Sequence, residues 1–295
     1  MEPVMEQLRS LAARLPLGPL QPARPVVAVL RLTGVIGQVG PLRAGLSLAR
    51  LAPQIERAFS VARVKAVALA INSPGGSPVQ SSLIARRIRQ LADEKNLPVF
   101  AFAEDVAASG GYWLALAADE IYAEETSILG SIGVIASSFG FADAIEKIGV
   151  KRRIYTAGEH KSMLDPFKPE NAEDVERLKA IQAEIHAGFQ AWVRERRGDR
   201  LRGTPEELFS GEFWTGRRAL ELGLIDGIDD LRSAMRRRFG DDVRLRLVGG
   251  ERSWLRRRLA SGSLLGDVPA ILPDGWADDL LAAVETRLWW NRFGL

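Results

Sequence analysis

Three short apolar runs, separated by helical stretches, constrain the fold of this chain more than any other feature. The runs cover residues 26–32, 66–71 and 98–103. Near-continuous runs of β-branched and apolar residues are typical of strands that are buried on both faces. Stretches of helical character lie between them, at about 46–60 and 78–95, so the pattern predicts crossover connections and a parallel sheet. We therefore expect an α/β fold of parallel βαβ units flanked by helices.

The third run leads to a lone serine, Ser109, which is followed by Gly110, Gly111 and an apolar segment of high helix propensity. A serine at the start of a helix lies near unpaired backbone N–H groups and the positive end of the helix dipole. That position suits a nucleophile whose target carbonyl becomes an oxyanion. The structural alternative is that Ser109 only caps the helix, while the glycines allow close packing.

The second run ends in a glycine pair, Gly75 and Gly76, before a helix that we expect to begin with Ser77 as N-cap and Pro78 in the first position. The carboxyl ends of parallel strands meet at one edge of a sheet, so the glycine pair and Ser109 are expected there together. Paired glycines let a substrate approach the backbone and leave N–H groups free for an anion. A plain strand-to-helix turn would have the same sequence.

A serine nucleophile needs a base, and Lys161 is one candidate. It follows Gly158, Glu159 and His160 in a short loop, and lysine is rare in this arginine-rich chain. A lysine serves as a general base only when its surroundings lower the pKa of an ammonium from ~10.4 toward neutrality. The alternative is an ordinary solvated surface lysine.

Three further elements are expected around this loop. They are a helix near 141–148, a strand at 152–156 before the loop, and a long one-sided helix over about 171–197.

Composition excludes several classes of function. The chain of 295 residues has no cysteine, which rules out disulfides and thiolate nucleophiles. Its two histidines, His160 and His186, lack the paired spacing of a zinc site, so no metal or other cofactor is expected. The formal net charge is only +3, with acidic residues interleaved among the basic ones, and no nucleic-acid partner is expected.

Four short motifs, in this order, resemble the signal peptide peptidase A (SppA) family of Ser-Lys serine peptidases, which have the ClpP/crotonase-like fold. They are Asn72-Ser73-Pro74-Gly75-Gly76, Ala108-Ser109-Gly110-Gly111-Tyr112, Gly130-Ser131-Ile132-Gly133 and Gly158-Glu159-His160-Lys161. The resemblance covers about residues 26–230. The one-sided helical pattern at the start of the chain and the change of composition after about residue 248 predict the domains 1–25 (amphipathic helix and linker), 26–248 (peptidase domain) and 249–295 (C-terminal extension).

The resemblance assigns roles to individual residues. It makes Ser109 the nucleophile, Lys161 its general base, and Ser131 the hydroxyl that orients the lysine. The backbone N–H of Gly110, with that of Gly75 or Gly76, would form the oxyanion hole, and His160 would have no catalytic role. It also implies a peptide substrate and a homo-oligomer, ring-like, in which Ser109 and Lys161 come from different chains.

Two other classes of function remain open. A crotonase-type acyl-CoA enzyme would share the fold and the oxyanion hole, but it does not explain Ser109 and Lys161 together. A catalytically idle or membrane-associated scaffold would explain the chain's ends, but it leaves the four motifs without a purpose.

The ends of the chain bear on location. No apolar run reaches the ~18–20 residues that span a bilayer, and no signal peptide is recognisable, so the expected location is cytoplasmic.

Near the C-terminus, Trp276, Leu280, Val284 and Leu288 recur at four-residue spacing. This stripe predicts a helix that packs on the domain or on another subunit. The alternative is peripheral attachment to an anionic membrane.

Overall fold

The computed structural model describes residues 24–37, 45–249, 284, 287–288 and 290–294. The predicted helix near the N-terminus and most of the predicted C-terminal helix lie outside these residues. The predicted domain boundaries therefore stay predictions, although strand β8 (Arg244–Val248) pairs with β1 (Val26–Thr33) and so completes the sheet up to residue 248.

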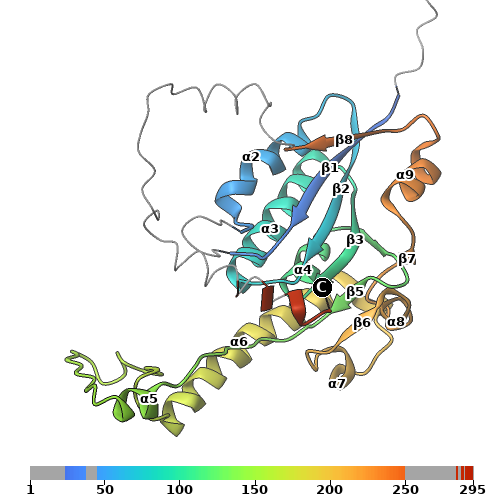
Figure 1. The fold of residues 1–295 in the computed structure, drawn as a ribbon. Helices are drawn as coiled ribbons and strands as arrows, with labels where there is room; N and C mark the ends of the chain where they lie inside the picture. The colour runs from blue at the N-terminus through green and yellow to red at the C-terminus, as the bar shows by residue number, and fades with distance from the viewer. Residues whose placement is uncertain (1–23, 38–44, 250–283, 285–286, 289, 295) are drawn as a thin grey trace, which may run out of the picture.

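One mixed sheet organises the described chain, and its strands run in the order β6-β5-β3-β2-β1-β8 (Figure 1). The central strands β2 (Val64–Ser73) and β3 (Val99–Ala108) are parallel to each other and to β1. Strand β5 (Ile128–Gly130) extends the parallel part, while β6 (Phe213–Thr215) is antiparallel to β5. Two short strands lie off this path: β4 (Glu120–Ala123) pairs with β3, and β7 (Gly227–Ile228) pairs with β4. The predicted α/β fold with parallel βαβ units is thus confirmed.

The two faces of the sheet carry separate apolar clusters, because side chains alternate along each strand. On β1, Ala28, Leu30 and Leu32 face a large cluster that includes residues of α2 (Leu48–Phe59), α3 (Pro78–Lys95) and α4 (Gly110–Ala115). The other face, with Val27 and Val29, packs against α9 (Leu231–Phe239). Burial on both faces explains why these strands have continuous apolar sequences.

A long arm projects from the sheet and consists of α5 (Ala142–Lys147), the loops around it and the far half of α6 (Ala172–Arg197) (Figure 1). Helix α5 has no buried residue, and α6 buries only Phe189, Val193 and Arg197, all in its C-terminal half. Large apolar side chains of the arm are exposed: Ile135, Phe139, Phe141, Ile148, Val150, Tyr155 and Phe167. The predicted strand at 152–156 is wrong, because these residues form no strand and lie in the arm, away from the sheet that could pair with them.

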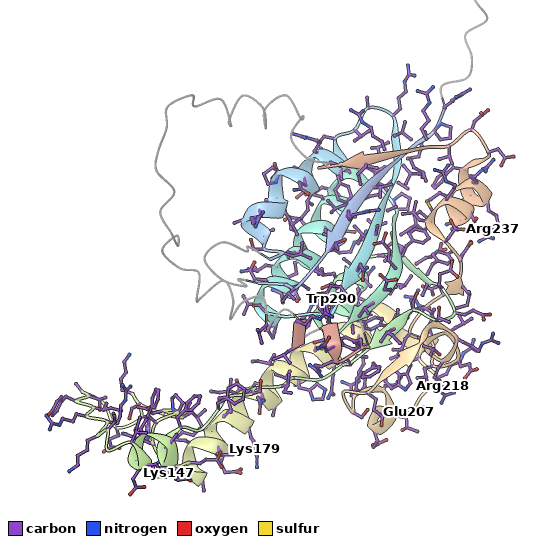
Figure 2. The ribbon with its side chains drawn as sticks, in the orientation of Figure 1. Lys147, Lys179, Glu207, Arg218, Arg237 and Trp290 are labelled. Atoms are coloured by element: carbon purple, nitrogen blue, oxygen red, sulfur yellow. The ribbon has the colours of Figure 1, made fainter. Side chains whose placement is uncertain are left out.

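The remaining elements lie near β6, at the end of the sheet from which the arm projects (Figure 1). They are the 3₁₀ turn η1 (Gly198–Arg200), α7 (Pro205–Leu208) and α8 (Gly216–Glu221). The few described residues near the C-terminus lie here as well, since the ring of Phe293 meets that of Phe213 edge-on at 5.1 Å. Trp290 is labelled in the same region in Figure 2. This contact agrees with packing of the C-terminal end on the domain.

The N-cap of α9 offers a simple test of the fold. Asp230 accepts hydrogen bonds from the backbone N–H groups of Arg232 and Ser233, at 2.8 and 3.0 Å. We expect Asp230→Ala to lower the free energy of unfolding by about 1 kcal/mol, because two N–H groups of the first turn lose their acceptor. Urea unfolding measures this. Asp241→Ala, which removes an exposed partner of Arg236, is the control and should change it by less than about 0.5 kcal/mol.

Candidate active site

Ser109 lies in the turn between β3 and α4, where the sheet edge meets the start of a helix. Its backbone has φ 52° and ψ −119°, a conformation that costs a non-glycine residue about 1–3 kcal/mol. Its side chain makes no capping hydrogen bond, so the hydroxyl does not serve the helix. The observation argues against the interpretation of Ser109 as a simple N-cap.

Ser131 lies beside this turn because β5 pairs in parallel with β3. Ala108 is paired with Gly130, and the N–H of Ser109 donates a hydrogen bond to the Gly130 carbonyl at 2.7 Å. Ser131 is buried and also has a positive φ, 51°. The two serines therefore follow the ends of neighbouring strands, and both are held in strained backbone conformations.

The glycine pair completes the same edge. A Cβ on Gly75 would lie 2.8 Å from the Cβ of Ser109 and 2.8 Å from the nitrogen of Gly110, so only glycine fits there. The N–H of Gly75 donates to the hydroxyl of Ser73 at 3.2 Å. Gly76 forms a parallel β-bridge with Ile36, which follows β1. The carbonyl of Ile36 accepts a hydrogen bond from the N–H of Ser77 at 2.8 Å. The structure thus brings Ser109, Gly110, Gly75 and Gly76 together.

Two N–H groups at this edge are left for a ligand. Gly110 is the first residue of α4 and has no acceptor within the helix. Gly76 forms no hydrogen bond through its N–H within the described part of the chain. A small cavity of about 10 Å³ touches both glycines and Ser109. The arrangement offers an oxygen two donors beside a serine hydroxyl.

Tyr112 anchors α4 to a distant segment of the chain. Its hydroxyl donates a hydrogen bond to the carbonyl of Leu224 at 2.7 Å, and its side chain is fully buried. Burial raises the pKa of Tyr112 well above its ordinary value, so the phenol stays protonated and keeps its role as donor. The start of α4, with Ser109 and Gly110, is therefore anchored to the segment that follows α8.

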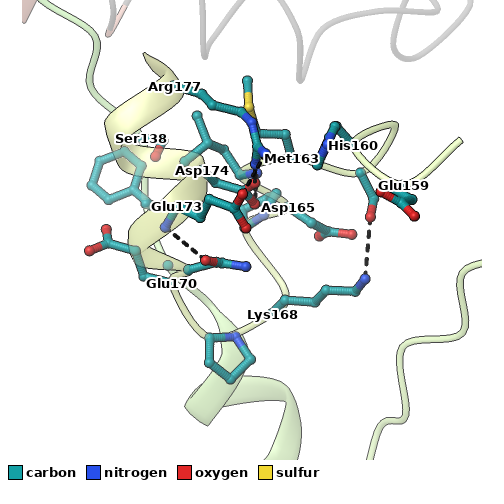
Figure 3. A pocket seen from close by; sticks show the side chains of 17 residues that line it. Ser138, Glu159, His160, Met163, Asp165, Lys168, Glu170, Glu173, Asp174 and Arg177 are labelled. Atoms are coloured by element: carbon teal, nitrogen blue, oxygen red, sulfur yellow. Dashed lines mark hydrogen bonds and ion pairs between the residues drawn. The ribbon is translucent and has the colours of Figure 1, made fainter. Parts of the chain in front are cut away.

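Lys161 lies in the arm, and the chain does not bring it to Ser109. Its neighbours Glu159 and His160 line a cavity of about 600 Å³ together with Glu173 and Arg177 of α6 (Figure 3). The cavity at Ser109 is instead lined by Ile185 and Phe189 of α6. Since a helix rises 1.5 Å per residue, these two levels of α6 are separated by about 18 Å. Lys161 itself is exposed.

Acidic and basic side chains both line the cavity in the arm, and several of them are bonded to one another. The ammonium of Lys168 donates to the hydroxyl of Ser162 at 3.3 Å, and Arg177 pairs with Glu173 and with Asp174 (Figure 3). The backbone N–H of Phe167, together with the charge of Arg152, lowers the pKa of Asp165. Within the described residues, no group of three or more histidine, aspartate or glutamate side chains is placed to hold a metal ion.

Sequence reasoning did not single out some residues at this site. Ser73 and Ser81 are both fully buried beside the glycines, and the Ser81 hydroxyl is the atom that a side chain on Gly110 would meet. Ser73 was part of a recognised motif, but nothing in the sequence marked Ser81. The apolar stripe of α6 predicts that Ile185 and Phe189 are buried against another part of the protein, but it does not indicate that this part is the site.

The site thus consists of a serine and two free N–H groups at a strand-to-helix turn of a largely parallel α/β sheet. Comparison with known proteins identifies the family. The family model described as peptidase family S49 matches residues 91–240, which is just over half of the chain. The chain therefore belongs to peptidase family S49, as its resemblance to signal peptide peptidase A predicts.

Curated relatives include proteases and proteins of another name. The chain is 37% identical over 220 residues to a chloroplastic serine protease SPPA of Arabidopsis thaliana, covering 72% of this chain and 32% of that protein. It is 34% identical to a putative signal peptide peptidase SppA of Enterococcus faecium, over 56% of this chain and 47% of the relative. A protein of Brucella abortus named Na(+)/H(+) antiporter NhaA is 54% identical over 272 residues, which is 91% of this chain but 37% of that protein. The chain thus spans about a third to a half of the length of these relatives.

Among solved structures, the chain is similar to a membrane-bound stomatin-specific protease, 1510-N. The TM-score is 0.50 at 16% sequence identity, covering 78% of this chain and all of that one. The likeness supports the fold. In the part of the chain that the structure describes, no helix combines the length and the apolar character needed to cross a bilayer.

Proposed function

We propose that this chain is a serine endopeptidase that hydrolyses peptides with Ser109 as nucleophile and Lys161 as general base. The observation that carries the proposal is the placement of Ser109: a strained turn holds its uncapped hydroxyl next to the N–H groups of Gly110 and Gly76. Membership of a peptidase family gives the reaction class. Substrates would be signal-peptide remnants or other membrane-associated or cytoplasmic peptides.

The reaction follows from these groups. The Ser109 hydroxyl gives its proton to the amine of Lys161 while its oxygen attacks the peptide carbonyl. The oxyanion that forms accepts hydrogen bonds from Gly110 and Gly76; Gly75 is the weaker candidate because its N–H already donates to Ser73. Lys161 then protonates the leaving amine, which frees the amino-side product. Finally, a water gives a proton to Lys161 and attacks the acyl-serine; Lys161 then returns that proton to the departing Ser109 oxygen, which restores both residues and frees the acid product.

We assign Lys161 to a neighbouring copy of the chain, because one copy cannot complete the site. The arm that carries Lys161 exposes a series of large apolar side chains, including Phe139 at 76% and Tyr155 at 91%. Exposed apolar surface of this kind marks a protein contact. An arm that docks on the next copy would bury these side chains and deliver Lys161 next to Ser131. Ser131, beside Ser109, would then orient the incoming amine.

A fluorophosphonate probe tests the nucleophile. The full-length protein should be labelled at one serine, because only an activated hydroxyl attacks phosphorus at a useful rate. Mass spectrometry of the labelled peptide locates the adduct. Ser109→Ala should remove all labelling, whereas Ser131→Ala should keep it at a reduced rate. Labelling that persists in Ser109→Ala would contradict the assignment.

The same probe separates the alternatives. A crotonase-type acyl-CoA enzyme or an idle scaffold of this fold has no need of an activated serine, so neither predicts labelling that depends on Ser109. Peripheral attachment to a membrane through the C-terminal extension stays a prediction from sequence. The contact of Phe293 with Phe213 favours packing of the chain's end on the domain.

A further inference from the structure

The small cavity beside Ser109 is walled by apolar side chains from four segments of the chain. It is lined by Ser109 and the two glycines Gly76 and Gly110, and its apolar wall consists of Pro78, Trp113, Val134, Ile185 and Phe189. These residues come from α3, from α4, from the loop after β5 and from α6. Such a wall beside a nucleophile is suited to an apolar side chain of the substrate.

The cavity is narrow, at about 10 Å³. This is close to the smallest space that admits one water molecule. Part of the wall is a stacked pair of rings, Trp113 on Phe189, with centroids 4.5 Å apart and an angle of 19° between planes. Phe189 is only 2% exposed and belongs to the main apolar cluster. Close packing behind this wall makes widening costly.

Hydrogen bonds connect the segments that form the wall. The indole N–H of Trp192 donates to the carbonyl of Trp113 at 3.4 Å, which ties α4 to α6. On the other side, the His186 ring nitrogen Nε2 lies 3.0 Å from the carbonyl of Ile132, next to the loop that carries Val134. The cavity is thus formed by segments that are fixed to one another.

The cavity fits one particular side chain of the substrate. In the residue whose carbonyl is attacked, Cβ lies two bonds from the carbonyl carbon, whereas in the residue that leaves as the amine it lies three bonds away. The cavity is lined by Ser109 and Gly110, which bind the carbonyl carbon and its oxygen in the proposed reaction. It is therefore the site for the side chain on the acyl side of the cleaved bond.

We propose that this cavity restricts the residue on the acyl side to a small side chain, such as the methyl group of alanine, and that Ile185 and the Trp113–Phe189 pair set the limit. This proposal rests on the proposed peptidase function. A pocket discriminates between apolar side chains by about 10- to 200-fold per methylene that fits or does not fit. Peptides with alanine at this position are therefore the preferred substrate class, ahead of those with leucine or phenylalanine.

The test uses peptidyl diphenyl phosphonates, which carry a chosen side chain at the position in question and phosphonylate serine nucleophiles: the serine oxygen attacks phosphorus and a phenoxide leaves. With the full-length protein, the alanine analogue should inactivate at least about tenfold faster than the leucine analogue. Ile185→Ala should lower this ratio about tenfold by opening the wall. Ile185→Phe should slow the alanine analogue relative to a glycine analogue. Ile181→Ala is the matched control, one turn away on α6 and 48% exposed, and should leave the ratio unchanged.

Equal rates for alanine and leucine analogues in the wild type would overturn the proposal. A change of ratio in Ile181→Ala as large as that in Ile185→Ala would overturn it too, because it would show a general effect of α6. A small fluorophosphonate without a side chain serves as the reference. Failure of this reference to label Ser109 would remove the peptidase function itself, whereas labelling without discrimination among the analogues would remove only the pocket.

Discussion

Ser109→Ala and Lys161→Ala should each lower peptide hydrolysis by about 10³-fold or more while the fold is kept. Ser109 supplies the attacking oxygen and Lys161 carries the proton, so neither works without the other. The double variant should therefore be no worse than either single one. Lys161 is exposed, and the half-buried Ser109 makes no capping hydrogen bond, so circular dichroism and the melting temperature should be unchanged. The measurement is kcat/KM on a fluorogenic peptide that the wild type cleaves.

Mixing the two inactive variants tests where the lysine comes from. If each site takes Ser109 from one copy and Lys161 from the next, co-refolded mixtures should regain up to about a quarter of the wild-type rate, because random assembly restores that share of sites. If both residues came from the same copy, every site in the mixture would stay defective. Absence of any recovery in verified mixed oligomers would thus contradict the assignment between chains.

The parts of the site that lie at the sheet edge could be predicted from the sequence. Strands buried on both faces have continuous apolar runs, and the carboxyl ends of parallel strands share one edge. Those two facts were enough to place Gly75, Gly76 and Ser109 together. The N-cap role of Ser77 and the first-turn position of Pro78 were also predictable, because capping depends on local sequence alone, and both are confirmed.

The arm could not be predicted in the same way. Residues 152–156 have the composition of a strand, but a strand forms only where a partner strand is available, and this segment lies away from the sheet. Likewise, the position of Lys161 relative to Ser109 depends on contacts between copies of the chain, which periodicity within one chain does not contain. Ser81 was missed for a different reason: a lone serine in an amphipathic helix carries no signal of its neighbours.

Arg197→Met is expected to destabilise the domain by about 3–5 kcal/mol, since it leaves a partly buried carboxylate without its main partner. Arg197, at the end of α6, is 2% exposed and forms two hydrogen bonds with Asp226, at 2.7 and 3.0 Å. Its Nε also donates to the carbonyl of Gly223 at 2.9 Å. This cluster attaches the C-terminal end of α6 to the segment after α8. The other half of α6 belongs to the arm, so the cluster also helps to fix the arm to the domain. Urea unfolding of the full-length chain measures the loss.

Two comparisons make this expectation specific. The double variant Arg197→Met with Asp226→Leu should recover much of the loss, because an apolar pair leaves no charge unpaired. Arg218→Ala, which breaks only exposed pairs with Glu207 and Glu221, should cost less than about 1 kcal/mol. An equal loss in Arg218→Ala would show that burial is not the cause.

The dependence of stability on pH gives the last check. Burial by itself raises the pKa of Asp226, but the hydrogen bonds and charge of Arg197, with the N–H of Ile121 and the charge of Arg200, outweigh burial and hold that pKa below its ordinary value. A depressed pKa in the folded state adds stability above the unfolded value of about 3.9, and this stability is lost as pH falls through the folded value. The gap in unfolding free energy between wild type and Arg197→Met should therefore be full at neutral pH and shrink below about pH 4. A gap that stayed constant down to pH 2 would mean that Arg197 acts through packing of its stem and not through the carboxylate of Asp226.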